Sequence, residues 1–396
     1  MHHLRCALRM AGFGAAAAML VGMQGIRDQG PGARGQGPGV RHFSQVHFAG
    51  WSALSAAGDA AATWEAVATG RSTLGCDAAI GWCGRLDDPR SAAEVAAALA
   101  AAAWHAAQIG SDALIDGAQF RPDWRQPSWR RTQPSWRQTQ PSWRSALPGL
   151  SVATSKGDPW LLEAALAGDL RHFTAAWPGQ ANAMVAAALG WPTYVNLPTA
   201  AACASGLYGL LAVADAIAAE RVPCGLAGAV DRSLTPLVVA GFRQLGVLCG
   251  DRQPGSPGAT GFAPAEGAAA IALGPQGPWR LVAGVRLGDA SHETELRDSA
   301  VLLAALHGLW SAAPSPDAIV IHGTGTSNGE GYEQSGLNAG PWRDIPRIRM
   351  KPVLGHTLGA SGLVELVVAL HSPHRRLWKL ALGFGGHLAA VAVERD

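Results

Sequence analysis

The stretch Ala200-Ala-Ala-Cys-Ala-Ser-Gly206 runs directly into Leu-Tyr-Gly-Leu-Leu-Ala-Val-Ala-Asp-Ala-Ile-Ala-Ala219, and this junction decides the fold. The second part is apolar nearly all round, which is typical of a helix buried in the middle of a large fold. Cys203 lies just before that helix, where the helix dipole is expected to lower the pKa of the thiol. A cysteine chosen at random is more often a buried structural residue, so Cys203 needs support from elsewhere in the chain.

Strand and helix patterns alternate outward from this junction in two successive passes, which predicts a layered α/β fold made of two related halves. Residues 46–273 form the first half, with the cysteine, and residues 274–396 form the second. The strands are expected near 46–50, 150–153, 224–228, 268–273, 280–285 and 318–321. The helices are expected near 61–70, 91–110, 160–167, 181–189, 206–219, 238–245 and 299–309, and after 359.

The composition predicts a large apolar core and does not indicate a broad charged surface. Of 396 residues, 48% are apolar and only 15% are charged, and the net charge is +2, so nothing global indicates binding to nucleic acid or to an anionic membrane. The six cysteines show no Cys-x-x-Cys spacing, so we expect neither a metal site nor a disulfide framework. A cytoplasmic location and the absence of a cofactor are the resulting expectations.

Two histidines stand at the ends of apolar segments that open into glycine-rich turns. His322 ends Ala-Ile-Val-Ile and begins His-Gly-Thr-Gly-Thr, while His356 lies in Lys-Pro-Val-Leu-Gly-His-Thr-Leu-Gly-Ala, which we interpret as a second strand-to-helix edge. Such places expose a side chain to a crevice. One thiol and two imidazoles suit decarboxylative condensation, because the thiol can hold an acyl chain and the imidazoles can stabilise the anion left by CO2.

From about Val46 to its end, the chain resembles the β-ketoacyl-acyl-carrier-protein synthases, the elongating condensing enzymes of the thiolase-like superfamily. Besides the three motifs above, the resemblance rests on residues 50–58, 227–231 and 266–268 and on Gly383-Phe-Gly-Gly386. It implies a thiolase-like layered αβαβα fold. It also implies action on acyl and malonyl thioesters carried by an acyl carrier protein, within fatty-acid or polyketide biosynthesis.

The resemblance implies a role for each residue of the three motifs. Cys203 matches the acyl-accepting nucleophile, and His322 and His356 match the pair that assists malonyl decarboxylation. Thiolases and starter-unit or chalcone synthases use other triads, so Cys-His-His indicates elongation. The family also implies a homodimer, or a heterodimer with another ketosynthase-like subunit.

Further residues are implied as supports for this triad. Lys351 matches a lysine that pairs with a glutamate, here Glu365, and this pair would hold the histidine loop in place. The backbone amides of Cys203 and Phe384 would form an oxyanion hole, with Phe384 also acting as a gate. Glu333 falls on a further acidic position of the family.

Some positions depart from the family pattern. Glu330 replaces the usual aspartate, and His387-Leu388 replaces the Thr-Asn that follows the last motif. The intervals from Cys203 to His322 and from His356 to Phe384 are short for the family, so a strand or a loop lining the dimer interface would be missing from the second one. The alternative function is therefore a partner subunit of a heterodimeric ketosynthase, similar to a chain-length factor, with little activity alone.

Two segments lie outside the predicted core. Residues 1–45 are expected to be a disordered extension; the apolar run 10–23 loosely resembles a signal peptide but is too short to span a membrane comfortably. Residues 121–145 hold a Gln-Pro-Ser-Trp-Arg repeat whose prolines predict a loop. The repeat is interpreted as an expanded loop without a role, as a docking site for the carrier protein, or, as a distant third, as a binder of nucleic acid.

Overall fold

The computed structural model describes residues 39–396 except 87, 89–90, 110–146, 293–296 and 298. The apolar run 10–23 and the repeat at 121–145 therefore lie outside the described residues. The predicted boundary at residue 46 is wrong by several residues, because Val40–His42 form strand β1. This strand pairs with β10, and Val40 is buried against the second half. The end of the predicted extension is thus part of the fold.

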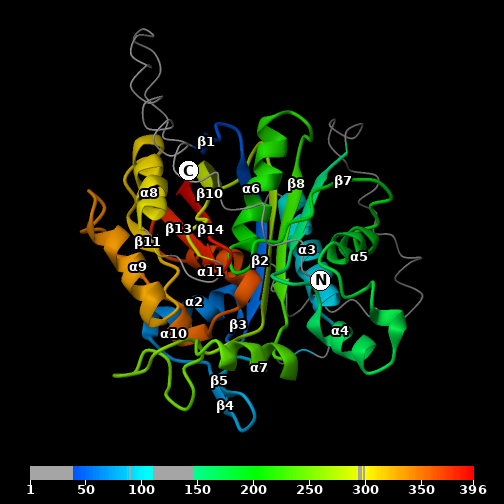
Figure 1. Cartoon of the computed structure of the whole chain (residues 1–396). Helices are drawn as coiled ribbons and strands as arrows, with labels where there is room; N and C mark the ends of the chain where they lie inside the picture. Colours follow the sequence, from blue (N-terminus) through cyan, green and yellow to red (C-terminus); the bar gives the residue numbers. More distant parts are fainter. Residues whose placement is uncertain (1–38, 87, 89–90, 110–146, 293–296, 298) are drawn as a thin grey trace, which may run out of the picture. The chain divides into compact units, whose positions relative to one another are not determined.

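The main sheet joins two halves at one strand pair (Figure 1). Its order is β12-β11-β13-β14-β10-β2-β9-β8-β6-β7, and β10 meets β2 through Trp279–Phe48 and Arg280–His47. The strands of the first half are β2 (His47–Ser55), β3 (Gly58–Asp59), β6 (Gly149–Ala153), β7 (Val195–Asn196), β8 (Gly225–Asp231) and β9 (Gly267–Gly274). Those of the second are β10 (Trp279–Gly288), β11 (Ala318–Val320), β12 (Arg347–Ile348), β13 (Arg376–Gly383) and β14 (His387–Arg395).

Helices cover these strands, most of them near the predicted ranges, whereas η4, α9 and α10 were not predicted. In the first half they are α2 (Ala60–Thr69), α3 (Ala92–Ile109), α4 (Pro159–Leu166), η4 (Leu170–His172), α5 (Gln180–Ala188), α6 (Ser205–Ala218) and α7 (Pro236–Gln244). In the second they are α8 (Ala300–Ala312), α9 (Ser327–Asn338), α10 (Lys351–Leu354), η5 (Leu358–Ala360) and α11 (Ser361–Ala369). A separate hairpin is formed by β4 (Gly75–Asp77) and β5 (Gly81–Cys83).

The cores show that the halves form five layers. Along β8, Ala227 and Ala229 face the core that contains α6 and α11, whereas Leu226 and Val230 face α3 and α5. Strand β14 alternates in the same way, with Val391 toward α6 and α11 and its neighbours toward α8. Since successive strand residues point to opposite faces, each half of the sheet has helices on both sides. The helices α6 and α11 therefore form the middle layer, which confirms the predicted layered fold.

Glycines allow the two middle helices to approach closely. A Cβ atom at Gly206 of α6 would lie 3.0 Å from Leu363 Cβ, and one at Gly362 of α11 would lie 2.8 Å from Leu207 Cγ. No larger residue fits without moving one helix. The starts of α6 and α11, and the segments that precede them, are therefore held next to each other.

The structure describes every residue between His356 and Phe384. It contains η5, α11 and β13, and β13 lies in the sheet between β11 and β14. Strand β13 therefore occupies the place between its two neighbours, and the expected loss of a loop lining the dimer interface stays a prediction. The interval is short because only the turn from Leu370 to Arg375 separates α11 from β13.

No helix in the described part of the chain is both long and apolar enough to cross a membrane.

Truncation of the middle layer should destabilise the fold. Leu210 in α6 is fully buried, so Leu210→Ala is expected to lower the free energy of unfolding by about 2–5 kcal/mol. Urea unfolding followed by circular dichroism measures this change. The control is Leu237→Ala on α7, where the side chain is 52% exposed and little change is expected. Equal effects of the two substitutions would contradict the central position of α6.

Candidate active site

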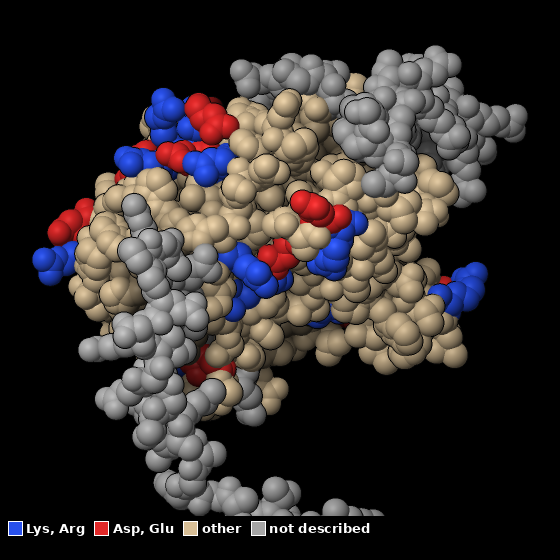
Figure 2. Space-filling model, turned by 90° about the horizontal axis from the view of Figure 1, so that it is seen from above, with Lys and Arg blue, Asp and Glu red and all other residues tan. Residues whose placement is uncertain are grey.

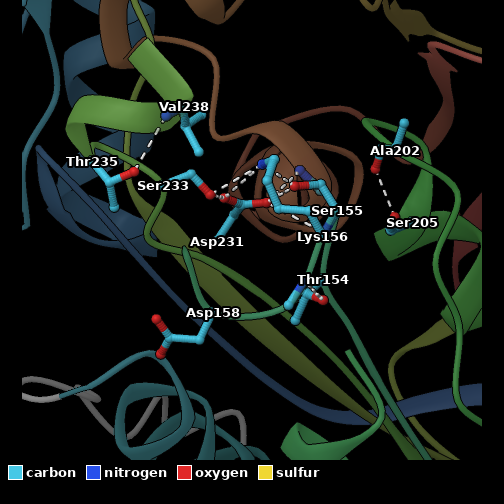
Figure 3. A network of polar contacts seen from close by, with 12 residues as sticks. Thr154, Ser155, Lys156, Asp158, Ala202, Ser205, Asp231, Ser233, Thr235 and Val238 are labelled. Atoms are coloured by element: carbon cyan, nitrogen blue, oxygen red, sulfur yellow. Dashed lines mark hydrogen bonds and ion pairs between the residues drawn. The ribbon is translucent and has the colours of Figure 1, made fainter. Parts of the chain in front are cut away.

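Cys203 is held by a tight turn before α6. Ala202, the residue before it, has a φ of 46°, in the left-handed region that non-glycine residues rarely adopt. The Ser205 hydroxyl stabilises this turn, because it donates to the Ala202 carbonyl at 2.6 Å and accepts from the Ala201 amide at 2.8 Å (Figure 3). Sequence reasoning missed the role of Ser205, although its place two residues after the cysteine was a usable signal.

The last glycine-rich motif packs directly against the cysteine. A Cβ atom at Gly383 would lie 2.7 Å from the Ala201 carbonyl oxygen and 3.1 Å from the Cys203 amide nitrogen. Only glycine permits this contact. Phe384 follows immediately and lines the same cavity as Cys203. The arrangement therefore brings the two segments of the predicted oxyanion hole side by side.

His322 follows β11, and a buried carboxylate holds its backbone. Glu333 of α9 accepts from the His322 amide at 2.6 Å and from the Gly323 amide at 2.7 Å. Burial raises the pKa of Glu333, while these two N–H groups oppose the increase. The role of Glu333 is therefore to hold the turn that carries the histidine.

Two buried lysines share one carboxylate beside the same turn. Glu365 of α11 accepts from Lys351 Nζ at 2.6 Å through one oxygen and from Lys379 Nζ at 2.6 Å through the other. Lys351 also donates to the His322 carbonyl, and Lys379 donates to the Ile321 carbonyl at 3.2 Å. The predicted pair Lys351–Glu365 is present in the structure. Lys379 was missed, although a lysine inside the apolar strand 377–382 was a signal in the sequence.

His356 is held by loop backbone and by an aromatic ring. The helix α10 precedes it, so the predicted strand-to-helix edge is wrong: the chain makes one helical turn and then reverses at Gly355, whose φ is 79°. The His356 amide donates to the Ala263 carbonyl at 2.8 Å, and its carbonyl accepts from the Ala265 amide at 2.9 Å. The Phe262 ring packs edge-on against the imidazole, with 4.9 Å between centroids.

One cavity brings the predicted catalytic residues together. It has a volume of about 340 Å³, and the imidazole centroids of its two histidines are 5.3 Å apart. The Nδ1 atoms of both imidazoles are buried, and neither has a hydrogen-bond partner within the described residues. Aromatic and aliphatic side chains form much of the remaining wall. The lining includes Cys203, His322, His356 and Phe384, with Phe242, Leu245, Val247, Phe262, Thr324, Thr326 and Leu382.

The two imidazoles are uncharged at neutral pH. Burial lowers the pKa of His322 well below its ordinary value, and Lys351, His356 and Lys379 add to this effect. Burial likewise lowers the pKa of His356, with further contributions from the lysines. A neutral imidazole can accept a proton through one nitrogen and donate one through the other.

The expected lowering of the cysteine pKa is wrong for the free protein. Burial raises the pKa of Cys203 to about 11, and the positive charges of Lys156 and Lys351 only partly offset it. A position at the start of a helix does not compensate for removing the thiolate from water. The thiol must therefore lose its proton to a neighbouring base when it reacts.

A second polar network lies beside the cysteine. The side chains of Ser155, Lys156 and Ser233 point toward Asp231 at the end of β8 (Figure 3). Lys156 Nζ lies 3.7 Å from Asp231 Oδ1, and Asp231 Oδ2 accepts from the Gly359 amide at 3.1 Å. Since Gly359 follows His356 closely in the chain, Asp231 connects the first half to the histidine loop. Sequence reasoning did not identify this network.

Glu330 and His387, which depart from the family pattern, each contact neighbouring residues in the structure. Glu330 accepts from the Gly325 amide at 2.9 Å and pairs with Arg349, so it holds the loop after His322. The His387 ring packs edge-on against Tyr208 of α6, with 5.7 Å between centroids. Neither Glu330 nor His387 lines the cavity next to Cys203.

Comparisons with known proteins agree with this geometry. The model of the β-ketoacyl synthase N-terminal domain matches residues 149–276, and that of the β-ketoacyl synthase C-terminal domain matches residues 288–384. Together they cover more than half of the chain. A search of curated proteins returns no match.

Solved structures share the fold at low sequence identity. One is a type II polyketide synthase acyl-carrier protein in complex with its ketosynthase bound to the hexaketide (AntDE:AntF); it has a TM-score of 0.72 and 19% identity and covers 90% of this chain and 100% of that one. The ishigamide ketosynthase/chain length factor has a TM-score of 0.67 and 18% identity, with coverage of 90% and 100%. A β-ketoacyl synthase from Burkholderia phymatum has a TM-score of 0.69 and 18% identity, with coverage of 89% and 99%.

The domain models and the fold support one conclusion. The matched ranges include Cys203 in the first domain and both His322 and His356 in the second, and they end at Phe384. The sheet and its helices form the thiolase-like layers that these relatives share. The chain therefore belongs to the β-ketoacyl synthase family and is a condensing enzyme of the ketosynthase type.

Proposed function

We propose that the chain is a β-ketoacyl-carrier-protein synthase that condenses an acyl group held on Cys203 with malonyl-carrier protein. The observation that carries this proposal is the single cavity in which Cys203, His322, His356 and Phe384 meet. Its apolar wall suits an acyl chain. The pathway served would be of the fatty-acid or polyketide type.

In the first half-reaction, a neutral imidazole accepts the Cys203 proton as the sulfur attacks the carrier-bound thioester. The S–C bond to Cys203 forms, the bond to the carrier sulfur breaks, and the proton passes to that sulfur. The backbone amides of Cys203 and Phe384 would stabilise the oxyanion of the tetrahedral intermediate. The close approach of Gly383 to the cysteine turn supports this pairing.

In the second half-reaction, His322 and His356 would donate hydrogen bonds to the malonyl thioester carbonyl. The bond between the malonyl α-carbon and its carboxylate breaks, CO2 leaves, and the electron pair forms a carbon–carbon bond with the acyl carbonyl. The bond between the acyl carbon and Cys203 breaks, the sulfur leaves as a thiolate, and it takes one proton from solvent. Uncharged imidazoles suit this step because a hydrogen-bonded enolate develops without an extra buried cation.

The proposed partners are an acyl carrier protein and a second ketosynthase-like subunit. Strand β7 is an edge of the sheet, with β6 as its neighbour. Nearby segments expose large apolar side chains, namely Leu166, Leu170, Phe173, Trp177 and Met184. Exposed apolar groups and an open strand edge favour pairing with another chain, as a homodimer or a heterodimer.

A cytoplasmic location is part of the proposal. Cys76, Cys83, Cys203, Cys224 and Cys249 are all free thiols in the described part of the chain. Unpaired cysteines favour a reducing compartment.

Binding to nucleic acid has less support. Figure 2 shows basic and acidic side chains next to each other in small groups on the face that it presents, with broad uncharged areas between them. A nucleic-acid site would require a continuous basic surface.

Acyl transfer to the cysteine tests the proposal directly. Incubation with an acyl-carrier donor should add one acyl group, detected by intact-protein mass spectrometry and located on Cys203 by peptide mapping. Cys203→Ser should abolish the adduct, and Cys76→Ser, which removes an exposed thiol, should retain it. An adduct that survives Cys203→Ser would contradict the role of Cys203.

The alternative is a subunit that shapes the pocket of another synthase and has little activity alone. The short interval between His356 and Phe384 is the observation that favours it. Turnover of malonyl-carrier protein by the purified chain, with and without a candidate ketosynthase partner, separates the two functions. Activity of the chain alone that disappears in Cys203→Ser would exclude the alternative.

The raised thiol pKa predicts an alkaline reactivity profile. Because the pKa of Cys203 is about 11, its iodoacetamide alkylation rate should rise by about tenfold per pH unit up to pH 10. Thiols of the urea-unfolded chain should instead level off above their ordinary pKa of about 8.5. Peptide mapping separates Cys203 from the other cysteines. A plateau for Cys203 below pH 9 would show that its thiolate is stabilised in the free protein.

The apolar surface predicts a change of assembly on substitution. Trp177 is 53% exposed, so Trp177→Glu should shift the chain from dimer to monomer in light scattering after size-exclusion chromatography. Leu237→Glu, at a similarly exposed apolar position of α7, is the control and should leave the mass unchanged. A wild-type monomer in the presence and absence of a partner subunit would contradict the proposed dimer.

A further inference from the structure

The chain uses lysine at three positions only. They are Lys156, Lys351 and Lys379, out of 31 lysine and arginine residues. All three act electrostatically on His356, and Lys351 and Lys379 also act on His322. Every other basic side chain of this class, including those of the surface ion pairs, is an arginine. Lysine is thus confined to the surroundings of the cavity.

The three lysines arrive from different elements. Lys156 follows β6, Lys351 begins α10, and Lys379 lies within β13. Lys351 and Lys379 are buried, while the side chain of Lys156 is partly exposed. Each has a buried carboxylate next to it, since Glu365 pairs with two of them and Asp231 with the third.

We propose that Lys379 is a second positioning lysine of the active site, which together with Lys351 holds the backbone that carries His322 and places positive charge near the two histidines. Its ammonium donates to Glu365 Oε2 and to the Ile321 carbonyl, directly before His322. Lys351 makes the equivalent contacts with Glu365 Oε1 and the His322 carbonyl. The carbonyls of Ile321 and His322 therefore each accept a hydrogen bond from one lysine. These two bonds fix the backbone that carries the His322 imidazole.

The charges around the imidazoles are balanced without a charged histidine. Two of the lysines pair with Glu365 and the third with Asp231, and Glu333 also acts on Lys379, so a protonated imidazole would add an unpaired charge in a site removed from water. Burial and the neighbouring Lys351 lower the pKa of Lys379 to about 8, against the opposing effect of Glu365. Lys379 is therefore charged below about pH 8. The groups that face the histidines are Lys156, Asp231, Lys351, Glu365, Glu333, Lys379 and the Cys203 thiol.

Only the catalytic consequence of this inference rests on the proposed function. If the chain condenses acyl and malonyl units as proposed, the positioning lysine sets the lower pH limit of turnover. In Lys379→Met, the acid limb of the pH–rate profile should move to higher pH. The charge state of the histidines can be measured without any substrate.

The first experiment uses the wild-type chain and its small number of lysines. Labelling with 13Cε-lysine gives one NMR signal for each lysine, and the three Lys→Met variants assign them. The Lys379 signal should titrate near pH 8, whereas an ordinary lysine titrates near pH 10.4. A neutral Lys379 amine at pH 7 would overturn the proposal, because no cation would then act on the imidazoles, and this result does not require Lys379→Met to fold.

The second experiment measures the protonation of the two imidazoles directly. In 15N-histidine-labelled protein, assigned through His322→Gln and His356→Gln, both rings should stay neutral to low pH. Lys379→Met should raise both midpoints by roughly one pH unit, as expected for the loss of a nearby charge at an effective dielectric constant of about 20. Lys156→Met should raise the midpoint of His356 more than that of His322.

Arg171→Met is the matched control, because it removes one cation from an 86% exposed side chain on η4. It should leave both histidine midpoints unchanged. Unchanged midpoints in Lys379→Met, or an equal shift in Arg171→Met, would overturn the proposal. Absence of condensing activity in the wild type with shifted midpoints would contradict the proposed function and leave this inference standing.

Discussion

The close contact between α6 and α11 is the constraint on which the active site depends. Gly206 and Gly362 have no side chains, so the two helices can pack closely against each other. Cys203 lies just before α6, the first of the two. His356 lies just before the second, separated from it by η5. Because each half of the sheet packs on one side of this pair, Cys203 from the first half and His356 from the second meet at one cavity.

Two non-glycine residues near this junction have strained backbone conformations, and hydrogen bonds hold both turns. Ala202 and Leu358 both adopt positive φ values, and each stands next to a catalytic segment. Non-glycine residues in this region cost about 1–3 kcal/mol each. The Ser205 hydroxyl holds one turn, and the Asp231 contact with the Gly359 amide holds the other. The surrounding hydrogen bonds thus offset strain that aims the thiol and the imidazole at the same space.

More of the fold could be predicted from the sequence than of the residues that hold the site in place. The apolar helix 206–219 and the layered α/β class could be predicted, because helix and strand periodicity are local properties of a sequence. The resemblance to a family supplied Cys203, His322, His356, Lys351, Glu365, Glu333 and Phe384. By contrast, the one-turn helix before His356 depends on Gly355 and on pairing with residues 263–265, which no local pattern reveals. Lys379 and Asp231 were missed because their partners are distant in the chain.

The pKa of Cys203 shows why placement alone does not determine reactivity. A helix N-terminus contributes a partial positive charge, but the thiol lies in a cavity walled by apolar and aromatic side chains, where the loss of hydration costs more. The same burial keeps the imidazoles neutral and so able to accept the thiol proton. In the mechanism that we propose, one environment therefore suppresses the thiolate of the free protein and keeps a neutral imidazole that can accept the thiol proton. Lys351 links these two effects, since its charge favours the Cys203 thiolate and disfavours the imidazolium form of both histidines.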